Sequence, residues 1–277
     1  MAHRVFRYAL LSLFAAGPVL AGGLPPLPPE PAPGATWSFA VLGDNRGAQD
    51  GTVREVFQRL LTAVRAVHPR FVLSTGDLIL GSGLTENTLR RQWEAYLAAI
   101  RTLTMPVYHA PGNHDLRNRF GPRLWKEYLG PTFYGFDYGG ARFIALDTET
   151  DRHRLGTRQF KWLAGQLVDA KGKTVFLYLH EPLYPVSKHV GGSMDVYPRE
   201  RDALHELLVL HRDEIGAVFA GHEHIYNVQV RDGIKYYITG GGGAPLHGKR
   251  PKGGFHHFLL VTMKDARPTI EVREPTP

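Results

Sequence analysis

Short apolar runs alternate along the chain with segments in which apolar residues recur every three or four positions. The runs lie at residues 39–42, 71–73, 107–110, 175–179 and 217–220. Short continuous apolar runs are typical of strands buried on both faces, whereas the three-to-four-residue recurrence is typical of helices with one buried face. The alternation of the two patterns predicts an α/β fold built in layers.

Four segments carry the helical recurrence. The first opens with a capping box, Thr52 followed by Glu55, and stops near Pro69. The third begins near Thr157, and Pro198 opens the fourth. The apolar stripes of the four helices are Val53, Val56, Phe57, Leu60, Leu61 and Val64; Leu89, Trp93, Leu97 and Ile100; Phe160, Leu163 and Leu167; and Ala203, Leu204, Leu207 and Leu208.

The second half of the chain adds strands that are not followed by helices. Residues 134–138 and 142–146 flank Gly139-Gly140 and predict a β-hairpin. Beyond residue 224 the pattern becomes β-like, at residues 226–230, 235–239, 258–263 and 269–272. Candidate site residues extend from position 44 to position 224, so a break between them would divide the site. One folded domain, residues 36–274, is therefore predicted.

Each of the five apolar runs ends in residues that bind metal ions in proteins. These endings are Gly43-Asp44, Gly76-Asp77, Gly112-Asn113-His114-Asp115, His180, and Gly221-His222-Glu223-His224. In open α/β sheets, ligands bind outside the carboxyl ends of the strands, so the five endings are expected to share one centre. Oxygen donors mixed with imidazole suit Mn, Zn, Fe or Mg. The pattern predicts a metal-dependent hydrolase.

A two-metal centre needs a group that bridges ions roughly 3.5–4 Å apart, and a carboxylate is a natural bridge. Asp77 is the candidate, because it follows the second strand of the series. Glycine precedes four of the endings and allows a sharp turn or a close approach to an ion. His222 and His224 are two residues apart, so in extended geometry they would point the same way, with Glu223 facing elsewhere.

The order of these motifs resembles that of the calcineurin-like metallophosphoesterase superfamily over about residues 37–263. Two details, His180-Glu-Pro-Leu-Tyr184 and the tyrosine of Gly221-His-Glu-His-Ile-Tyr226, resemble its purple acid phosphatase-like branch. The resemblance implies an α/β fold of the four-layer αββα sandwich type, with two mixed β-sheets. It also implies two divalent metal ions (Mn, Zn, Fe or Mg).

The resemblance further assigns roles to individual residues. It implies one metal held by Asp77, Asn113, His180 and His222, and a second held by Asp44, Asp77 and His224. His114, oriented by Asp115, falls where the superfamily has a histidine that contacts the phosphate or protonates the leaving group.

Two positions depart from the superfamily pattern. Arg46 stands where many members have the histidine of Asp-x-His, and Leu80 stands where purple acid phosphatases have a tyrosine. The second metal is therefore expected to lack one protein ligand, although three ligands and water still suit a catalytic metal. We hypothesise that Arg46 contacts the substrate phosphate, because a guanidinium group binds phosphate oxygens in pairs. The alternative is a solvated loop residue.

The expected activity is hydrolysis of a phosphate ester by metal-activated hydroxide, with phosphomonoesters favoured over diesters by the resemblance alone. The alternative is a non-catalytic module that binds phosphate or metal and has a degraded second metal site, which Arg46 and Leu80 leave open. Residues 184–197 and 240–252 contain Lys188, His189 and His247 and either border the substrate pocket or are solvated loops.

Composition adds limits to this interpretation. The 277 residues include 33 Lys and Arg against 26 Asp and Glu, a net charge of +7, and no cysteine. Disulfides and thiolate ligands are excluded, and the charge favours anionic substrates such as a small phosphorylated molecule. Basic residues do not form a run interleaved with aromatics, so a nucleic-acid groove is not expected.

The N-terminal residues have the pattern of a secretion signal. A basic start is followed by apolar residues 8–16 and by a small residue, Ala21, suited to cleavage. We therefore predict a signal peptide at residues 1–21, a solvated Pro-rich linker at residues 22–35, and export to the periplasm or the extracellular space. An uncleaved membrane anchor is the alternative, but the apolar stretch is short for a membrane span.

Overall fold

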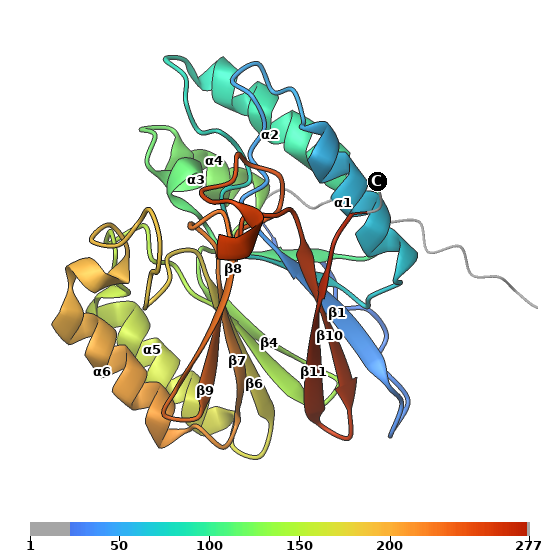
Figure 1. Ribbon diagram of the computed structural model, residues 1–277, viewed down its shortest axis with the longest axis vertical. Coiled ribbons are helices and arrows are strands. Elements are labelled where there is room, and N and C mark those ends of the chain that lie inside the picture. The colour runs from blue at the N-terminus through green and yellow to red at the C-terminus, as the bar shows by residue number, and fades with distance from the viewer. Residues whose placement is uncertain (1–22, 276–277) are drawn as a thin grey trace, which may run out of the picture.

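Two β-sheets face each other in the middle of the molecule, with helices on both outer faces (Figure 1). The computed structural model describes residues 23–275. One sheet has the order β11-β10-β1-β2-β3 and the other has the order β4-β5-β6-β7-β9-β8. The first comprises β1 (Trp37–Leu42), β2 (Val72–Ser74), β3 (Val107–His109), β10 (Phe258–Lys264) and β11 (Arg267–Arg273); the second comprises β4 (Tyr134–Tyr138), β5 (Ala141–Ala145), β6 (Thr174–Leu179), β7 (Ile215–Ala220), β8 (Tyr226–Arg231) and β9 (Ile234–Thr239).

Both sheets combine parallel and antiparallel pairs. In the first, β1, β2 and β3 are parallel, β10 is antiparallel to β1, and β11 is antiparallel to β10. In the second, β5, β6, β7 and β9 are parallel, and the outer strands β4 and β8 are antiparallel to their neighbours. The prediction of two mixed sheets is confirmed.

The helices complete a four-layer arrangement. The buried faces of α1 (Glu55–Ala66), α2 (Glu86–Ile100) and α4 (Gly121–Tyr128) pack on the first sheet. On the second sheet lie α5 (Gly156–Asp169) and α6 (Pro198–Leu210). The short elements α3 (Asn113–Leu116), η1 (Met194–Val196) and η2 (Arg250–Lys252) belong to connecting segments. The predicted four-layer αββα sandwich is confirmed.

Strand β1 shows why the apolar runs are continuous. Phe39 and Val41 point into the core between the two sheets, whereas Ala40 and Leu42 point toward α1 and α2. The Phe39 ring stacks on that of Phe71 with centroids 5.5 Å apart. Successive side chains of a strand face opposite sides, so burial of both sides requires apolar residues at consecutive positions.

Two details of the helix prediction were wrong. Arg54, not Thr52, is the N-cap of α1, and no side chain caps that helix. The Thr52 amide donates to the Asp50 carboxylate (2.8 Å) and its carbonyl accepts from Ala48 (2.9 Å), which holds Thr52 in a turn before the helix. In addition, α3 and α4 were not predicted, because α3 has four residues and α4 has eight, too short for a clear period.

The Pro-rich segment, predicted to be a solvated linker, is bound along the edge of the domain. The Tyr108 hydroxyl donates to the carbonyl of Pro26 (3.3 Å), and the Tyr138 hydroxyl donates to that of Pro29 (2.8 Å). The Gly139 amide donates to the Glu30 carboxylate (2.9 Å). Most residues of the segment remain exposed, but these contacts fix its path. The predicted signal peptide lies outside the described residues, and within residues 23–275 no helix is long and apolar enough to cross a membrane.

Candidate metal centre

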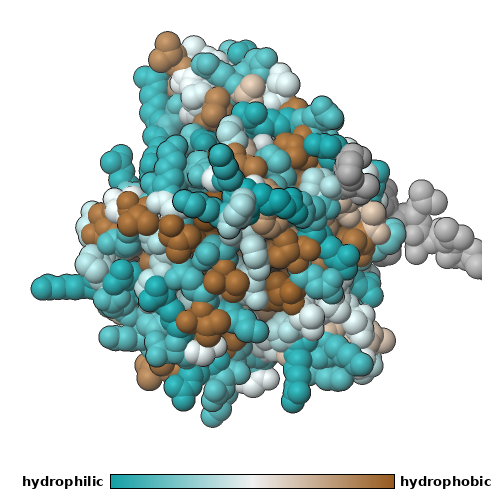
Figure 2. Space-filling view, in the orientation of Figure 1, coloured by the Kyte–Doolittle hydropathy of each residue, from teal (hydrophilic) through white to brown (hydrophobic). Residues whose placement is uncertain are grey.

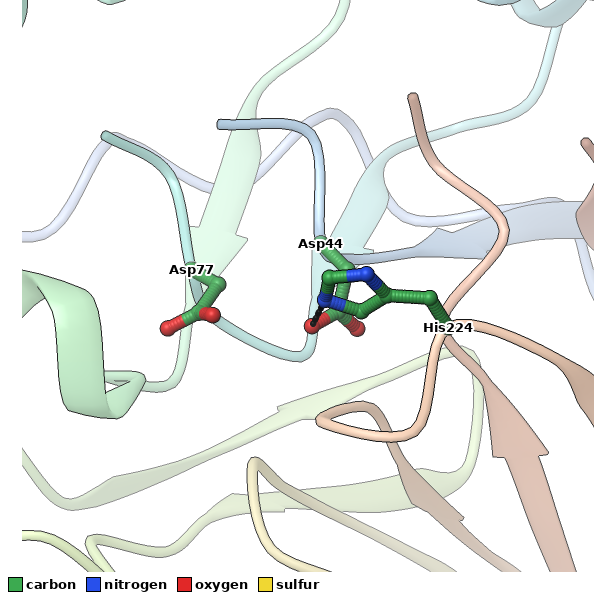
Figure 3. Close-up of side chains that lie close together, drawn as sticks. All are labelled: Asp44, Asp77 and His224. Carbon is green, nitrogen blue, oxygen red and sulfur yellow. Dashed lines mark ion pairs between the residues drawn. The ribbon is translucent and has the colours of Figure 1, made fainter. Parts of the chain in front are cut away.

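All six predicted metal ligands lie together where β1, β2, β3, β6 and β7 end. Their side chains come from the segments that follow these strands, and each is buried: Asp44, Asp77, Asn113, His180, His222 and His224. Figure 3 shows Asp44, Asp77 and His224, with the His224 ring against the Asp44 carboxylate. The structure thus brings together residues 180 positions apart in sequence, and their assignment as ligands stays a prediction.

Four donor atoms form a first group. His180 Nε2 lies 3.1 Å from Asn113 Oδ1, 3.4 Å from Asp77 Oδ1 and 3.1 Å from His222 Nδ1. These are the four residues that the resemblance assigned to one metal. Imidazole nitrogen with carboxylate and amide oxygen is a donor set for Zn, Mn or Fe.

The other nitrogens of the two imidazoles show why a cation fits this group. His180 donates its Nδ1–H to the carbonyl of Thr75 (2.8 Å), and His222 donates its Nε2–H to the carbonyl of Gly192 (3.2 Å). In neutral rings these bonds leave the lone pairs of His180 Nε2 and His222 Nδ1 directed at each other. Two lone pairs at 3.1 Å repel unless a positive charge, a proton or a metal ion, lies between them.

A second group shares Asp77 with the first. One donor atom each from Asp44, Asp77 and His224 lies within 4.8 Å of the other two. His224 Nε2 is 3.4 Å from Asp44 Oδ1, and its Nδ1–H donates to the carbonyl of Pro245 (2.6 Å). Because Asp77 takes part in both groups, it lies where a bridging carboxylate is needed.

The local field at the centre favours positive charge. Burial acts to lower the pKa of His180, but the carboxylates of Asp77, Asp44 and Glu149 outweigh it and hold that pKa above its usual value. Burial, followed by the charge of His180, holds the pKa of His222 well below its usual value. His222 is therefore a neutral imidazole whose Nδ1 lone pair faces a position that attracts a positive charge, either a proton on His180 or a metal ion.

Three of these residues have a left-handed backbone: Asp44 (φ 60°), Asp77 (φ 56°) and His222 (φ 68°). Such a conformation costs about 1–3 kcal/mol at a residue other than glycine and is found at functional sites. The His222 amide donates to the Asp44 carboxylate (3.0 Å), which offsets part of this cost. The expectation that His222 and His224 lie on one extended segment was therefore wrong, because the chain turns at His222.

The close approach of the Asp44 side chain explains the glycine before His222. A Cβ atom at Gly221 would collide with the Asp44 carboxylate, and a Cβ at Gly112 would collide with the backbone of Asp77. Any side chain at these two positions would displace the residues of the centre.

Asp115 has a different part from the one expected. Its carboxylate accepts from the backbone amides of Gly112 (2.8 Å), Leu78 (2.9 Å), Asp77 (3.0 Å) and Ile79 (3.3 Å). The His114 ring is oriented instead by the carbonyl of Leu80, which accepts from its Nδ1–H (2.5 Å). Asp115 thus fixes the loop that carries Asp77, and the expected contact with His114 is replaced by Leu80.

Arg46 lies over His114. Its guanidinium group donates to His114 Nε2, and its Nε is buried without a hydrogen-bond partner among the described residues. Burial lowers the pKa of His114, and although Asp77 opposes this, Arg46 adds to it and the pKa stays below its usual value. Arg46 is half-buried at the centre, so the alternative of a solvated loop residue does not fit.

A pair of buried carboxylates beside His180, those of Glu149 and Glu181, was not predicted from the sequence. Arg117 Nη2 lies 3.3 Å from Glu181 and 3.6 Å from Glu149, and His153 Nδ1 lies 2.8 Å from Glu181. Burial, followed by the charge of Glu149, raises the pKa of Glu181 to about 10. Glu181 belongs to the His180-Glu-Pro motif and could have been singled out, whereas Glu149 carries no sequence signal.

Two further histidines reach the centre from the loops expected to border it. The ring centroids of His189 and His222 are 3.9 Å apart, and those of His247 and His224 are also 3.9 Å apart. The His224 amide donates to His247 Nδ1 (3.3 Å). Both loops therefore contact the candidate ligands.

Sequence comparison identifies the family. The model of the calcineurin-like phosphoesterase family matches residues 38–226, a span that contains all six candidate ligands. The chain belongs to this family. The family uses two-metal centres, which agrees with the two groups of donor atoms that share Asp77. The resemblance inferred from the motifs is confirmed.

Two relatives place the chain within the family. It is 29% identical over 253 residues to purple acid phosphatase 21 of Arabidopsis thaliana, covering 79% of this chain and 54% of the relative. It is 28% identical over 165 residues to a probable glycerophosphodiester phosphodiesterase of Arcobacter nitrofigilis, covering 56% of this chain and 57% of the relative. The chain thus spans little more than half the length of these two relatives.

The fold is also similar to that of a solved structure. Purple acid phosphatase from seeds of yellow lupin (Lupinus luteus) superposes with a TM-score of 0.72 at 20% identity, over 90% of this chain and 53% of that one. The similarity to purple acid phosphatases agrees with the branch that the motifs around His180 and Tyr226 indicated.

Proposed function

We propose that this family member hydrolyses phosphate esters at a two-metal centre. The observation that carries the proposal is the pair of imidazole lone pairs, on His180 Nε2 and His222 Nδ1, that face each other at 3.1 Å beside two oxygen donors. The contact needs a positive charge between the two nitrogens, either a proton on His180 or a metal ion. The oxygens of Asp77 and Asn113 beside them complete a donor set that suits a transition metal.

The residues present fit two ions. Asp77, Asn113, His180 and His222 would hold one, and Asp44, Asp77 and His224 would hold the other, with Mn, Zn, Fe or Mg as the candidate metals. When bound, the ions would polarise the phosphate oxygens and supply a nucleophile from water near neutral pH. The remaining chemistry falls to side chains of this chain.

Arg46 would bind the phosphate. Its guanidinium group lies beside the second donor group, where the expected fourth protein ligand is missing, and its buried Nε has no hydrogen-bond partner within residues 23–275. A phosphate oxygen would satisfy that N–H, and a guanidinium group presents paired donors to phosphate. Arg46 would then hold the phosphate next to the second group by a hydrogen bond rather than by metal coordination.

His114 would serve the leaving group. Its Nδ1–H is committed to Leu80, so Nε2 is the atom that can carry a proton to the departing alcohol oxygen. In the structure Nε2 accepts from Arg46. A phosphate group that takes over Arg46 frees Nε2, and its negative charge raises the pKa of the ring toward the range useful for general acid catalysis.

Phosphomonoesters are the favoured substrates. The relatives include both a phosphatase and a phosphodiesterase, so family membership does not decide between the two. Arg46 adds a positive charge with a free donor at the centre, which suits the doubly charged terminal phosphate of a monoester better than the singly charged diester.

The test is hydrolysis of a chromogenic phosphomonoester and its diester analogue across added Mn, Zn, Fe and Mg, with Asp77→Ala as the control. We expect metal-dependent turnover that is lost in the variant, with the monoester preferred. Two bound metals without turnover of either ester would instead favour a non-catalytic phosphate- or metal-binding module, a function that the three-residue second group also suits.

We also propose export, on the basis of the basic and apolar pattern of residues 1–21. Expression of the full chain in a bacterial host, followed by N-terminal sequencing of protein from the periplasm and the medium, tests it. A mature N-terminus near residue 22 supports the proposal, and full-length protein retained in the cytosol would contradict it.

A further inference from the structure

Exposed apolar side chains gather in one loop beside the centre. Among residues 23–275, eleven large apolar side chains are exposed, and four of them lie in the twelve residues from 186 to 197: Val186, Val190, Val196 and Tyr197. We call residues 186–197 the apolar loop. Figure 2 shows apolar side chains interspersed with polar ones over the loops next to α5 and α6. Isolated exposed apolar residues are common, but groups of them mark contact sites.

The apolar loop is attached directly to the candidate ligands. Glu223, between His222 and His224, accepts from the backbone amides of Ser187 (2.6 Å), Val186 (2.7 Å) and His189 (3.3 Å). The carbonyl of Gly192 accepts from His222. The His189 ring lies 3.9 Å from that of His222, and the side chain of the next residue, Val190, is 61% exposed.

Internal bonds fix the loop in this form. The Asp195 carboxylate accepts from the amides of Gly191 (2.6 Å) and Ser193 (3.1 Å), and the Ser193 hydroxyl donates to the carbonyl of His189 (3.3 Å). Met194 is buried beneath them. The valines are therefore held in solvent by a preorganised backbone, which lowers the entropy cost of binding a ligand against them.

We propose that the apolar loop binds the hydrocarbon part of the leaving alcohol, so that the preferred substrates are small amphiphilic phosphate esters. This inference rests on the proposed function. Hydrolysis breaks the bond between phosphorus and the alcohol oxygen; water supplies the hydroxyl group to phosphorus and the proton to the alcohol. With the phosphate at the centre, the alcohol has to leave past neighbouring residues, and His189 and Val190 are among these.

Charge on the loop agrees with this choice of occupant. Lys188 is exposed between Val186 and Val190, and its positive charge acts on His189 and His247. Because His189 and His247 contact the candidate ligands, the charge of Lys188 adds to the attraction for an anionic head at the centre, and the valines on either side of Lys188 offer apolar surface to a tail. For such a substrate, kcat/KM should rise step by step as the tail is lengthened one methylene at a time, which a protein partner would not predict.

The experiment measures kcat/KM for ethyl, butyl and hexyl esters of phosphate, in whichever ester type, mono or di, the wild type hydrolyses. The reactivity of these esters is nearly constant, since the added carbons are remote from phosphorus. A fully buried methylene is worth about fourfold, so an open loop should give roughly twofold to fourfold per added methylene until the tail outgrows the valines. In the double variant Val186→Ser/Val190→Ser, the ratio of kcat/KM for the hexyl ester to that for the ethyl ester should fall toward one.

Val168→Ser is the matched control, because Val168 lies on α5 and is 65% exposed. It should keep the wild-type ratio. A wild-type rate that does not depend on chain length, or a ratio unchanged in the double variant, would overturn the inference and would point to a protein-docking role for the loop. Absence of metal-dependent hydrolysis for every ester would instead overturn the proposed function, so the two failures are distinguishable.

Discussion

The two donor groups of the centre differ in how completely the protein builds them. The first has four donors from this chain, and both of its imidazoles are fixed by backbone carbonyls, those of Thr75 and Gly192. The second has three donors, one of them shared, and Arg46 lies where a fourth ligand was expected. The first group is therefore a preformed cation site, whereas the second has a position to be completed by water or substrate. Separate substitutions can test this division.

Loss of the shared residue should have the largest effect. Asp77→Ala removes a donor atom from both groups at once. We expect both metals to be lost and activity to fall more than about a thousandfold, because two-metal catalysis needs both ions in place. Metal content by elemental analysis, together with ester hydrolysis, checks this result. Retention of two tightly bound ions would contradict the shared role.

Removal of one imidazole from each group should separate the two sites. His222→Ala should weaken the first site and His224→Ala the second, each by more than about a hundredfold, since even residues that only support a ligand contribute 10–100-fold. Metal titration calorimetry on the two variants measures the affinities. Equal loss at both sites in either variant would show that the groups do not bind as independent units.

Arg46 variants should sharpen the contrast at the incomplete site. Arg46→Ala loses a charge-assisted hydrogen bond to phosphate and should lower kcat/KM about 10–100-fold, with the metals retained. Arg46→His restores the superfamily ligand and should tighten the second metal about tenfold or more. Activity and metal affinity are measured on the same preparations. An Arg46→Ala enzyme with wild-type KM and kcat would remove Arg46 from substrate binding.

Stepwise metal loading should show the smallest of these effects. We expect Mn or Zn to bind in two phases whose dissociation constants differ about tenfold or more. The tighter phase should be absent in His222→Ala. Inorganic phosphate should reduce the ratio of the two dissociation constants severalfold. A ligand that completes the second site must raise the affinity for the second metal by reciprocal linkage. Calorimetry with and without phosphate measures the ratio. A ratio that phosphate leaves unchanged would contradict completion by substrate.

The strands and the candidate ligand positions could be predicted from sequence, because burial and metal binding each restrict which residue types can occupy those positions. Strand β1 had to be apolar at consecutive positions to be buried on both faces, and Asp44 had to follow it to reach a ligand at the strand end. The left-handed turn at His222 could not be predicted, because it depends on the contact of its amide with Asp44, which lies 178 residues away in sequence.

The same limit explains the residues that were missed or misassigned. Asp115 was expected to orient the adjacent His114, but its carboxylate reaches amides of the loop after β2 instead. Glu149 was invisible because its burial beside Glu181 depends on the packing of β5 against β6. The Pro-rich segment was assigned from composition alone, which does not reveal the tyrosine hydroxyls that bind it.

The attachment of the apolar loop through Glu223 has a consequence for variation and engineering. Glu223 binds Val186, Ser187 and His189 only by their backbone amides, which every residue except proline can supply. The side chains at positions 186, 188 and 190 can therefore be exchanged without altering the bonds that seat the loop against the metal centre. Substitutions in the loop can therefore change substrate preference, in evolution or by design, while the residues of the metal centre stay the same.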